Sequence, residues 1–137
     1  MSENPTELLM AAARQLRSRH GAALAPWQVT PAQARALRLV CRLDAPRPSE
    51  LARRLRIAPR SATEVIDALQ ERGLVVREQD AGDRRAICIR PTPEGEAMNR
   101  EIDAARREAA DAFLAVLAPA DRAELDRILA ILVDQPD

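Results

Sequence analysis

The sequence has little of what builds disulfide-rich domains, membrane spans or metal centres. Among its 137 residues are two cysteines, Cys41 and Cys88, which lie far apart and lack the short spacing of a zinc motif. A disulfide framework or a metal site is therefore not expected. No apolar run approaches the length that spans a membrane, and the residues after Met1 are polar and acidic, unlike a signal peptide. We predict a soluble, cytoplasmic protein.

Side chains that carry out catalysis are also scarce. His20 is the only histidine, and no nucleophile or carboxylate motif surrounds it. The four glycines form no phosphate-binding loop, and there is no tyrosine whose hydroxyl would hold a phenolic ligand. The sequence therefore argues against an enzyme, and it gives no reason to expect a cofactor or a metal.

The charges are balanced in number but not in position. Twenty-one arginines, with no lysine, accompany 21 acidic residues. There are six arginines against three acids in residues 1–46, ten against seven in 47–90 and five against eleven in 91–137, which gives net charges of +3, +3 and −6. A basic front and middle with an acidic tail fits a nucleic-acid-binding protein. An ordinary solvated surface is the alternative that charge alone leaves open.

Apolar residues recur at helical spacing along most of the chain. Thr30, Pro31 and Gln33 form a start signal, with Thr30 as the N-cap, Pro31 at the first helical position and Gln33 closing a capping box. Gly73 is predicted to end a helix as its C-terminal cap. The predicted helices cover residues 6–20, 30–43, 49–72 as a pair joined at "RIAP", 93–118, and a last segment that begins at 119.

The pattern changes from helical to strand-like after the helix pair. Residues 74–80 and 85–91 are rich in β-branched side chains, and the glycine-containing segment "AGDR" lies between them. They predict a β-hairpin. A helix-turn-helix followed at once by a hairpin is a winged helix. The predicted fold class is therefore mainly α with a small β-hairpin (α+β), with a winged helix-turn-helix core over residues 30–92.

The second helix of the pair has polar and charged residues at its start and on its outer side. In helix-turn-helix proteins these positions meet base edges in the major groove, and the first helix crosses the DNA backbone. Arg60 suits guanine, while Glu64 suits a cytosine amino group or an ion pair with Arg60. The alternative is an ordinary helical hairpin with a solvent-exposed surface. The predicted DNA-binding residues of the pair are Arg53 and Arg54 for phosphates, and Arg60, Ser61, Thr63 and Glu64 for bases.

The turn of the predicted hairpin, "DAGDRRA", is short and doubly cationic. Arg84 and Arg85 on an extended tip suit the narrow, electronegative minor groove of DNA. We expect Asp83 to orient an arginine side chain through a charge-assisted hydrogen bond, and Gly82 to let the backbone turn. A solvated turn with an internal ion pair is the alternative.

Three segments together resemble the core of MarR-type transcription regulators: "VTPAQARALRLV", "SELARRLRIAPRSATEVIDALQERGLVVRE" and "DAGDRRAICIRPTPEG". The resemblance runs from about Thr30 to Gly95. It implies a homodimer with interlocking terminal helices that binds a pseudopalindromic operator, usually as a repressor, and that is often released by a small effector.

The resemblance also maps functional positions onto this chain. The reading helix of the family corresponds to residues 59–69, and its wing tip to Asp83, Arg84 and Arg85. The sequence departs from the family pattern at three places: Glu64 and Ala68, where relatives are often basic or polar, Arg56, where glycine is frequent, and "IRPT", where a leucine-threonine pair is more usual.

The predicted helix over residues 93–118 gives a physical reason for dimerisation. An apolar stripe runs along it, which is a long face for a single copy of this chain to leave exposed. Pairing around a twofold axis would bury it. We therefore expect residues 1–137 to form one domain, with residues 6–20 and 93–134 as dimerisation helices. A stripe packed within its own chain is the alternative. The stripe consists of Met98, Ile102, Ala105, Ala109, Ala112, Phe113 and Val116.

Other means of regulation are weighed beside a small effector of unknown identity. Cys41, in an apolar helix, is expected to be a small buried side chain. Cys88 is out of phase with its neighbouring isoleucines and is expected to be exposed, which would allow a thiol-redox switch. His20 and Trp27 lie near the family's ligand cleft but are predicted to be structural or exposed. A winged-helix protein-interaction module, or anti-regulator, that does not bind DNA is a further alternative.

Overall fold

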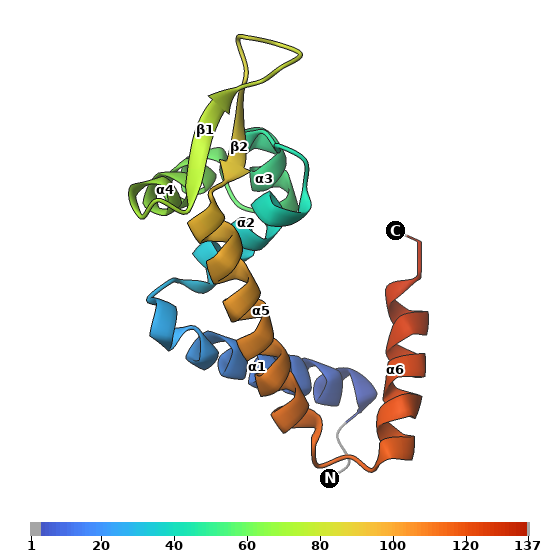
Figure 1. Ribbon diagram of the computed structural model, residues 1–137. Helices are drawn as coiled ribbons and strands as arrows, with labels where there is room; N and C mark the ends of the chain where they lie inside the picture. Colours follow the sequence, from blue (N-terminus) through green and yellow to red (C-terminus); the bar gives the residue numbers. More distant parts are fainter. Residues whose placement is uncertain (1–3, 137) are drawn as a thin grey trace. The chain divides into compact units, whose positions relative to one another are not determined.

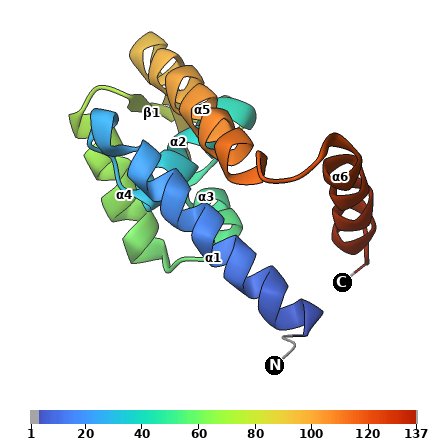
Figure 2. The same cartoon turned by 90° about the horizontal axis from the view of Figure 1, so that it is seen from below.

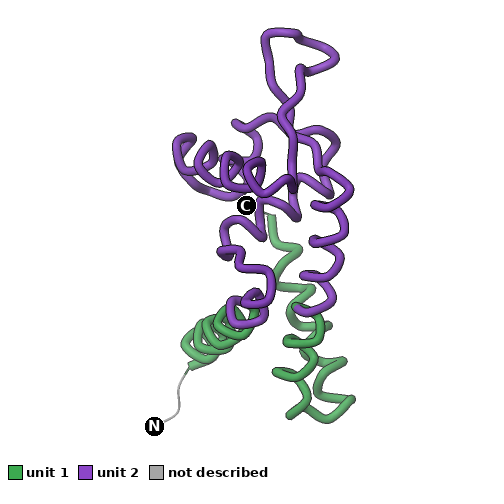
Figure 3. The backbone as a smooth tube through the Cα atoms, turned by 60° about the vertical axis from the view of Figure 1, so that its left-hand side comes forward, with its two compact units in different colours: residues 1–20, 106–137 green, residues 21–105 purple. Residues whose placement is uncertain are grey.

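The computed structural model divides the chain into two compact units (Figure 3). One unit comprises residues 21–105, and the other comprises residues 1–20 with residues 106–137. The structure describes residues 4–136, so the two ends of the predicted single domain lie outside the described residues. None of the helices among the described residues is long and apolar enough to cross a membrane.

Helices dominate both units, and one hairpin interrupts them (Figure 1). In chain order the elements are α1 (Pro5–Ala23), the 3-10 helix η1 (Ala25–Trp27), α2 (Pro31–Arg42), α3 (Pro48–Leu55), α4 (Pro59–Glu71), β1 (Val75–Gln79), β2 (Ile87–Pro91), α5 (Pro93–Leu114) and α6 (Pro119–Val133).

Proline marks the start of each of the six α-helices described. Its fixed backbone angle suits the first helical turn, where its missing N–H has no partner to lose. At α2 the predicted capping box is confirmed, because Thr30 Oγ1 accepts from Gln33 N and Gln33 Oε1 accepts from Thr30 N, each at 3.1 Å.

Two helices of the winged core end in the same left-handed turn. Gly73, with φ of 74°, follows α4, and its amide donates to Gln70 O while the amide of Leu74 donates to Leu69 O, each at 2.9 Å. This paired pattern is a Schellman motif and confirms Gly73 as a cap. Arg56, with φ of 56°, closes α3 in the same way.

The two strands form an antiparallel hairpin, as predicted. Val75 pairs with Pro91 at its base, and Gln79 pairs with Ile87 near its tip. The amide of Ile89 also donates to the carbonyl of Pro46 at 2.8 Å, which fastens the loop before α3 along β2. Below the hairpin lies the main core, made of Ala36, Leu37, Val40, Leu51, Leu55, Ile66, Leu69, Leu74, Val75 and Ile89.

The predicted exposure of Cys88 is wrong. Cys88 is buried, with 2% of its surface exposed, and Ile89 is also buried, whereas Ile87 is 47% exposed. β2 is not a free edge strand: it packs against α2 and α3, and the amide of Ile89 donates to the carbonyl of Pro46 in the loop before α3, so strict alternation of exposure fails. Ile87 lies near the end of the hairpin, beyond this cover.

The junction between the hairpin and α5 is tightly packed. Thr92 Oγ1 donates to the carbonyl of Gly73 at 2.6 Å and accepts from the amide of Gly95 at 3.0 Å. A Cβ atom on Gly95 would lie 2.0 Å from the carbonyl oxygen of Leu74. The segment "PTPEG" therefore joins the strand to the helix at a point where only glycine fits.

A second, smaller core holds the first half of α5. Leu24, Val29, Ala34 and Ile102 are buried together, and Trp27 and Met98 pack against them. The expectation that the whole apolar stripe of α5 is exposed is therefore wrong for Met98 and Ile102, because η1 and the start of α2 cover that half of the helix.

The other unit consists of the first part of α1, the end of α5, and α6, which follows α5 through a short turn (Figure 2). The guanidinium of Arg19 lies 5.3 Å from the ring centre of Phe113. An apolar pocket of about 290 Å³ is lined by residues of all three helices. Many large apolar side chains are exposed in this unit: Leu8, Leu9, Met10, Val116, Ile128, Ile131, Leu132 and Val133.

Candidate nucleic-acid interface

The helix α4 has one buried side and one exposed side, as its sequence period predicts. Ala62, Ile66 and Leu69 are buried and hold the helix on the core. The four predicted base-reading residues, Arg60, Ser61, Thr63 and Glu64, are all exposed. Of these, Thr63 donates its hydroxyl hydrogen to the carbonyl of Pro59 at 3.1 Å, so the hydroxyl oxygen remains as an acceptor.

Arg60 and Glu64 are not paired with each other in the structure, although they lie one helical turn apart. Among residues 4–136, neither the guanidinium of Arg60 nor the carboxylate of Glu64 has an ion-pair partner. The next acidic residue, Asp67, accepts from Arg77 Nη2 of β1 at 2.5 Å, and Arg77 also donates to Gln70. Arg77 thus ties the hairpin to α4, a role that the sequence analysis missed.

The predicted phosphate-binding arginines lie on the exposed side of α3. Arg53 is exposed and lies 3.8 Å from Glu50, one turn earlier on the same helix. Arg54 and the capping residue Arg56 are exposed and have no ion-pair partner among the described residues. An exposed pair at 3.8 Å contributes little to stability, so Arg53 remains available to a stronger anion.

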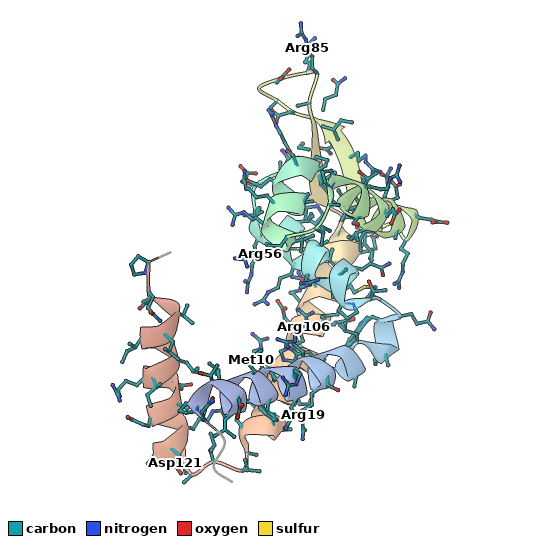
Figure 4. The ribbon with its side chains drawn as sticks, turned by 180° about the vertical axis from the view of Figure 1, so that it is seen from behind. Met10, Arg19, Arg56, Arg85, Arg106 and Asp121 are labelled. Carbon is teal, nitrogen blue, oxygen red and sulfur yellow. The ribbon has the colours of Figure 1, made fainter. Side chains whose placement is uncertain are left out.

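The tip of the hairpin is shaped by two aspartates. Asp80 Oδ1 accepts from the amide of Gly82 at 2.8 Å, and Asp80 Oδ2 accepts from Arg47 Nε at 3.1 Å. Asp83 Oδ1 accepts from the amide of Arg85 at 3.0 Å. Arg84 and Arg85 are exposed, and Arg85 points away from the helices (Figure 4).

These contacts correct two expectations about the tip. Asp83 holds the backbone of the turn rather than an arginine side chain, because its carboxylate is bound by the amide of Arg85. Gly82 does not have a positive φ, so the turn depends on the acceptor of Asp80 rather than on a left-handed glycine. The sequence reasoning missed Arg47 and Asp80, which connect the loop before α3 to the tip. The triplet "DAG" is the local signal from which the turn-forming role of Asp80 could have been predicted.

The electrostatics of Asp80 agree with this role. The hydrogen bond from the amide of Gly82, and then the one from the Arg47 guanidinium, hold the pKa of the Asp80 carboxyl below its usual range. Asp80 is therefore ionised at neutral pH and keeps both contacts.

Taken together, these residues give one unit an exposed helix start and a narrow cationic tip. Both features belong to residues 21–105. An arrangement of this kind offers hydrogen-bond donors and an acceptor to base edges, and guanidinium groups to phosphates and the minor groove.

Comparison with known proteins places the chain in a family. The MarR family model matches residues 29–87. The HTH-type transcriptional repressor MdtR of Bacillus subtilis is 30% identical over 104 residues, which cover 76% of this chain and 67% of that protein. The chain belongs to the MarR family. Members of the MarR family are transcription regulators and not enzymes, which confirms both the resemblance and the expectation that this chain is not an enzyme.

Solved structures of MarR-family proteins have the same fold. Rv2887 of Mycobacterium tuberculosis matches with a TM-score of 0.84 in complex with DNA, at 26% identity over 96% of this chain and 98% of that one. The same protein in complex with p-aminosalicylic acid gives 0.80, at 26% identity over 96% and 100%. Wild-type MarR of Escherichia coli gives 0.84 at 21% identity, over 96% and 98%. The predicted winged-helix fold is confirmed.

The thiols of this MarR-family chain are poorly suited to redox sensing. Burial, followed by the negative charges of Glu96 and Asp103, raises the pKa of the half-buried Cys41 thiol to about 11. At neutral pH this thiol is protonated and a weak nucleophile. Cys88 is buried, and its Sγ lies 3.9 Å from the carbonyl oxygen of Gln79. Cys41 therefore lacks the low pKa, and Cys88 the exposure, that the redox alternative needs.

Trp27 connects η1 to neighbouring elements of the fold. Its Nε1 donates to Glu101 Oε2 of α5 at 2.9 Å, and its carbonyl accepts from Arg72 Nη2 at 2.8 Å. The ring thereby joins η1 to α5, and the backbone carbonyl joins it to Arg72, the residue that caps α4. Trp27 packs against the smaller core, as expected for a structural residue.

Proposed function

We propose that this MarR-family regulator binds double-stranded operator DNA in the cytoplasm as a homodimer and acts as a repressor that a small effector releases. The observation that carries the proposal is the presence, in one compact unit, of an exposed, unneutralised start of α4 and an arginine-tipped hairpin. Each feature fits a different groove of DNA.

In the proposed complex, α4 reads the major groove. Arg60 binds guanine through its two parallel donors, and Ser61 and Thr63 contact bases or phosphates. Glu64 accepts from a cytosine amino group, because no arginine of the described chain neutralises its carboxylate. Arg53 and Arg54 neutralise phosphates.

The wing contacts the minor groove in the same complex. Arg84 and Arg85 lie on a turn that Asp80 and Asp83 hold through backbone amides. A pre-shaped turn presents both guanidinium groups without ordering the loop on binding, which lowers the entropic cost of the contact.

Dimerisation is supported by the exposed apolar side chains of the unit that contains α6. Leu8 is 53% exposed, Ile131 58% and Val133 80%. A run of this kind on the surface of a single copy marks an interface. A twofold pairing would bury it, and would place two copies of α4 about 34 Å apart, one turn of DNA, to match a pseudopalindrome.

The comparisons support the remaining parts of the proposal. Rv2887, at 26% identity, is described in complex with DNA and with p-aminosalicylic acid. MdtR is described as a repressor. By this analogy, an effector would act on the present chain by preferring a dimer shape that no longer matches two successive grooves.

Fluorescence anisotropy on DNA from upstream of the protein's own gene, over a series of salt concentrations, tests the proposal. We expect specific binding over an unrelated duplex, with log K falling against log salt by about 0.9 per phosphate neutralised. The variant Arg84→Ala/Arg85→Ala should bind at least tenfold more weakly and with a smaller slope. The control Arg17→Ala/Arg107→Ala also removes two exposed arginines, but away from the wing. Both lie in the proposed dimerisation helices, so its mass is checked by sedimentation, and as a dimer it should bind as the wild type does.

Two outcomes would contradict the proposal. If neither duplex binds at low salt, DNA is not the partner, and the protein-interaction alternative replaces it. If the wing variant and the control variant weaken binding equally, the wing does not contact the DNA.

A further inference from the structure

The end of α4 is held by an arginine that binds two consecutive backbone carbonyls. Arg72, which caps α4, donates from Nη2 to the carbonyl of Trp27 at 2.8 Å and from Nη1 to the carbonyl of Gln28 at 3.0 Å. The two acceptors lie 45 and 44 positions earlier in the chain. A planar guanidinium has its donors in a fixed fork, whereas the ammonium of a lysine is a single point charge. Arg72 therefore sets both the distance and the orientation between the end of α4 and this turn.

The turn that Arg72 binds has a strained backbone. Gln28, which ends η1, has φ of 53° and ψ of 40°, left-handed values that are unfavourable for a residue with a side chain. Its amide donates to the carbonyl of Ala25 at 3.3 Å, which is long for a backbone hydrogen bond. Such a conformation persists only where the surrounding structure holds it. Arg72 contributes to this by binding the carbonyls before and after Gln28.

The same turn is bound to α5 through Trp27. The indole Nε1 donates to Glu101 Oε2 at 2.9 Å, and the ring packs against the smaller core that contains Ile102. A hydrogen bond to a carboxylate is charge-assisted and stronger than one between neutral groups. Among the described residues, α4 packs mainly on α2, α3 and β1, so it has little direct contact with α5. The Trp27–Gln28 turn is therefore the connection between the two helices.

Arg72 lies at the end of α4 opposite to the predicted base-reading residues. At a rise of about 1.5 Å per residue, Arg60 lies about 18 Å from Arg72 along the helix. A tilt of about 5° at the Arg72 end moves the start of α4 by about 1.5 Å. A binding group has to be held within about 0.5 Å of its working position. The contact at Arg72 therefore affects whether Arg60 and Glu64 can meet base edges.

We propose that Arg72 is a positioning residue for α4, and that it couples the placement of α4 to α5 through the Trp27–Gln28 turn. In this assignment Arg72 does not contact DNA itself. Its effect on operator recognition rests on the proposed function, whereas the coupling between the two helices does not. A change on α5 that releases the indole should then alter operator binding although it removes no DNA-contacting residue.

The first test measures the coupling by NMR without DNA. Trp27 is the only tryptophan of the sequence, so one indole N–H resonance reports on its bond to Glu101. Glu101→Ala removes the acceptor, and we expect the amide resonances of residues 60–64 to shift together with the indole. In an Arg72→Met background, which has no donor, the shifts of residues 60–64 should be at least threefold smaller. The control Glu108→Ala removes an exposed carboxylate further along α5 and should shift neither.

The second test measures operator specificity by anisotropy. Arg72→Lys keeps the positive charge but loses the fork, so operator affinity should fall at least fivefold while affinity for an unrelated duplex stays within twofold. A general loss of stability would instead lower Tm and weaken both duplexes together. Glu101→Ala should also weaken operator binding. Combined with Arg72→Met, it should add less than its effect alone, because both changes break one connection. Sedimentation checks that each variant keeps the mass of the wild type.

Three outcomes would overturn the proposal. If residues 60–64 do not shift in Glu101→Ala, or shift equally in the Arg72→Met background, Arg72 does not couple the helices. Additive losses of operator affinity mean that Arg72 and Glu101 act separately. Equal weakening of both duplexes by Arg72→Lys means that Arg72 supports stability and not the placement of α4. If the wild type binds neither duplex, the proposed function fails, and the NMR shifts still decide whether the coupling exists.

Discussion

Arg56 shows how a single residue stores strain at the predicted DNA surface. Its φ of 56° and ψ of 46° are left-handed values, which cost a non-glycine residue of the order of 1–2 kcal/mol. The hydrogen bonds from the amides of Arg56 and Ile57 that close α3 offset this cost. The conformation places an exposed guanidinium next to Arg53 and Arg54, where a glycine would contribute no charge. The departure from the family's usual glycine therefore adds a cation at a left-handed turn.

Gly95 shows the opposite case, a position where no side chain fits. Because a Cβ atom would lie 2.0 Å from the backbone carbonyl of Leu74, we expect Gly95→Ala to lower the free energy of unfolding by about 3 kcal/mol. Gly21 is the matched control: it lies within α1, and a methyl group added there would meet no atom within 4 Å, so Gly21→Ala should raise stability by about 0.5–1 kcal/mol. Thermal unfolding by circular dichroism at one protein concentration measures both changes. Equal shifts in Tm would show that the junction yields more easily than its geometry indicates.

At the scale of the elements, local signals were enough to predict the helices and the hairpin. Thr30 with Gln33, and Gly73, act through neighbours four residues away or fewer, so the sequence pattern contains them in full. The burial of Cys88 was not predictable in this way, because β2 packs against α2, α3 and the loop between them, which come some 40 positions earlier in the chain. The same reason explains why Arg47 was missed: its partner is brought to it by tertiary folding.

In the candidate site, too, some features were predicted from local sequence and others were not. The exposure of Arg60 and Glu64 follows from helical period alone and was predicted correctly. The position of the hairpin tip was predicted correctly, but the hydrogen-bond partner of Asp83 was not. Residue types suggested that Asp83 holds an arginine side chain, whereas the short span of the turn makes the amide of Arg85 the nearer donor.

The hairpin tip should therefore depend on Asp80 through two separable contacts. Asp80→Ala removes the acceptor for both the Gly82 amide and Arg47, so the Gly82 amide should exchange with solvent roughly two- to tenfold faster. Asp80→Asn keeps an acceptor for the amide but loses the ion pair, and should show a smaller increase. Hydrogen exchange followed by NMR gives the rates. In the control Asp83→Asn, the Gly82 amide should be unaffected; a rise there equal to that of Asp80→Ala would contradict the assignment.

The same contact has a pH dependence whose sign is fixed. The pKa of Asp80 is lowered in the folded protein, so the contact stabilises the tip above the carboxyl's ordinary pKa and is lost as the pH falls through the lower, folded value. Protection of the Gly82 amide should accordingly stay constant near neutrality and decrease only in acid.

At the scale of the whole molecule, charge is less segregated in space than along the sequence. Residues 21–105 carry 14 arginines against 12 acids, a net charge of +2, and the remaining residues carry 7 against 9, a net charge of −2. The difference is small because the acidic start of α5 belongs to the same unit as α4. In the proposed complex, attraction to DNA would then come from local arrangement, namely the arginines of α3, α4 and the hairpin tip, rather than from a net field.

Apolar exposure, by contrast, is concentrated in the unit that contains α6, and it predicts the oligomeric state. We expect the wild type to have twice the chain mass of 15.1 kDa in sedimentation at micromolar concentration. Ile131→Glu should raise the dissociation constant of the dimer at least tenfold, because the twofold axis buries the new carboxylate twice. Ile87→Glu is the matched control, since Ile87 on the wing is 47% exposed and Ile131 is 58% exposed. If both variants remain dimers, or if the wild type is a monomer, α6 is not the interface. If Ile131→Glu alone dissociates, its operator affinity should also fall, because a monomer engages one half-site and loses the gain from binding two.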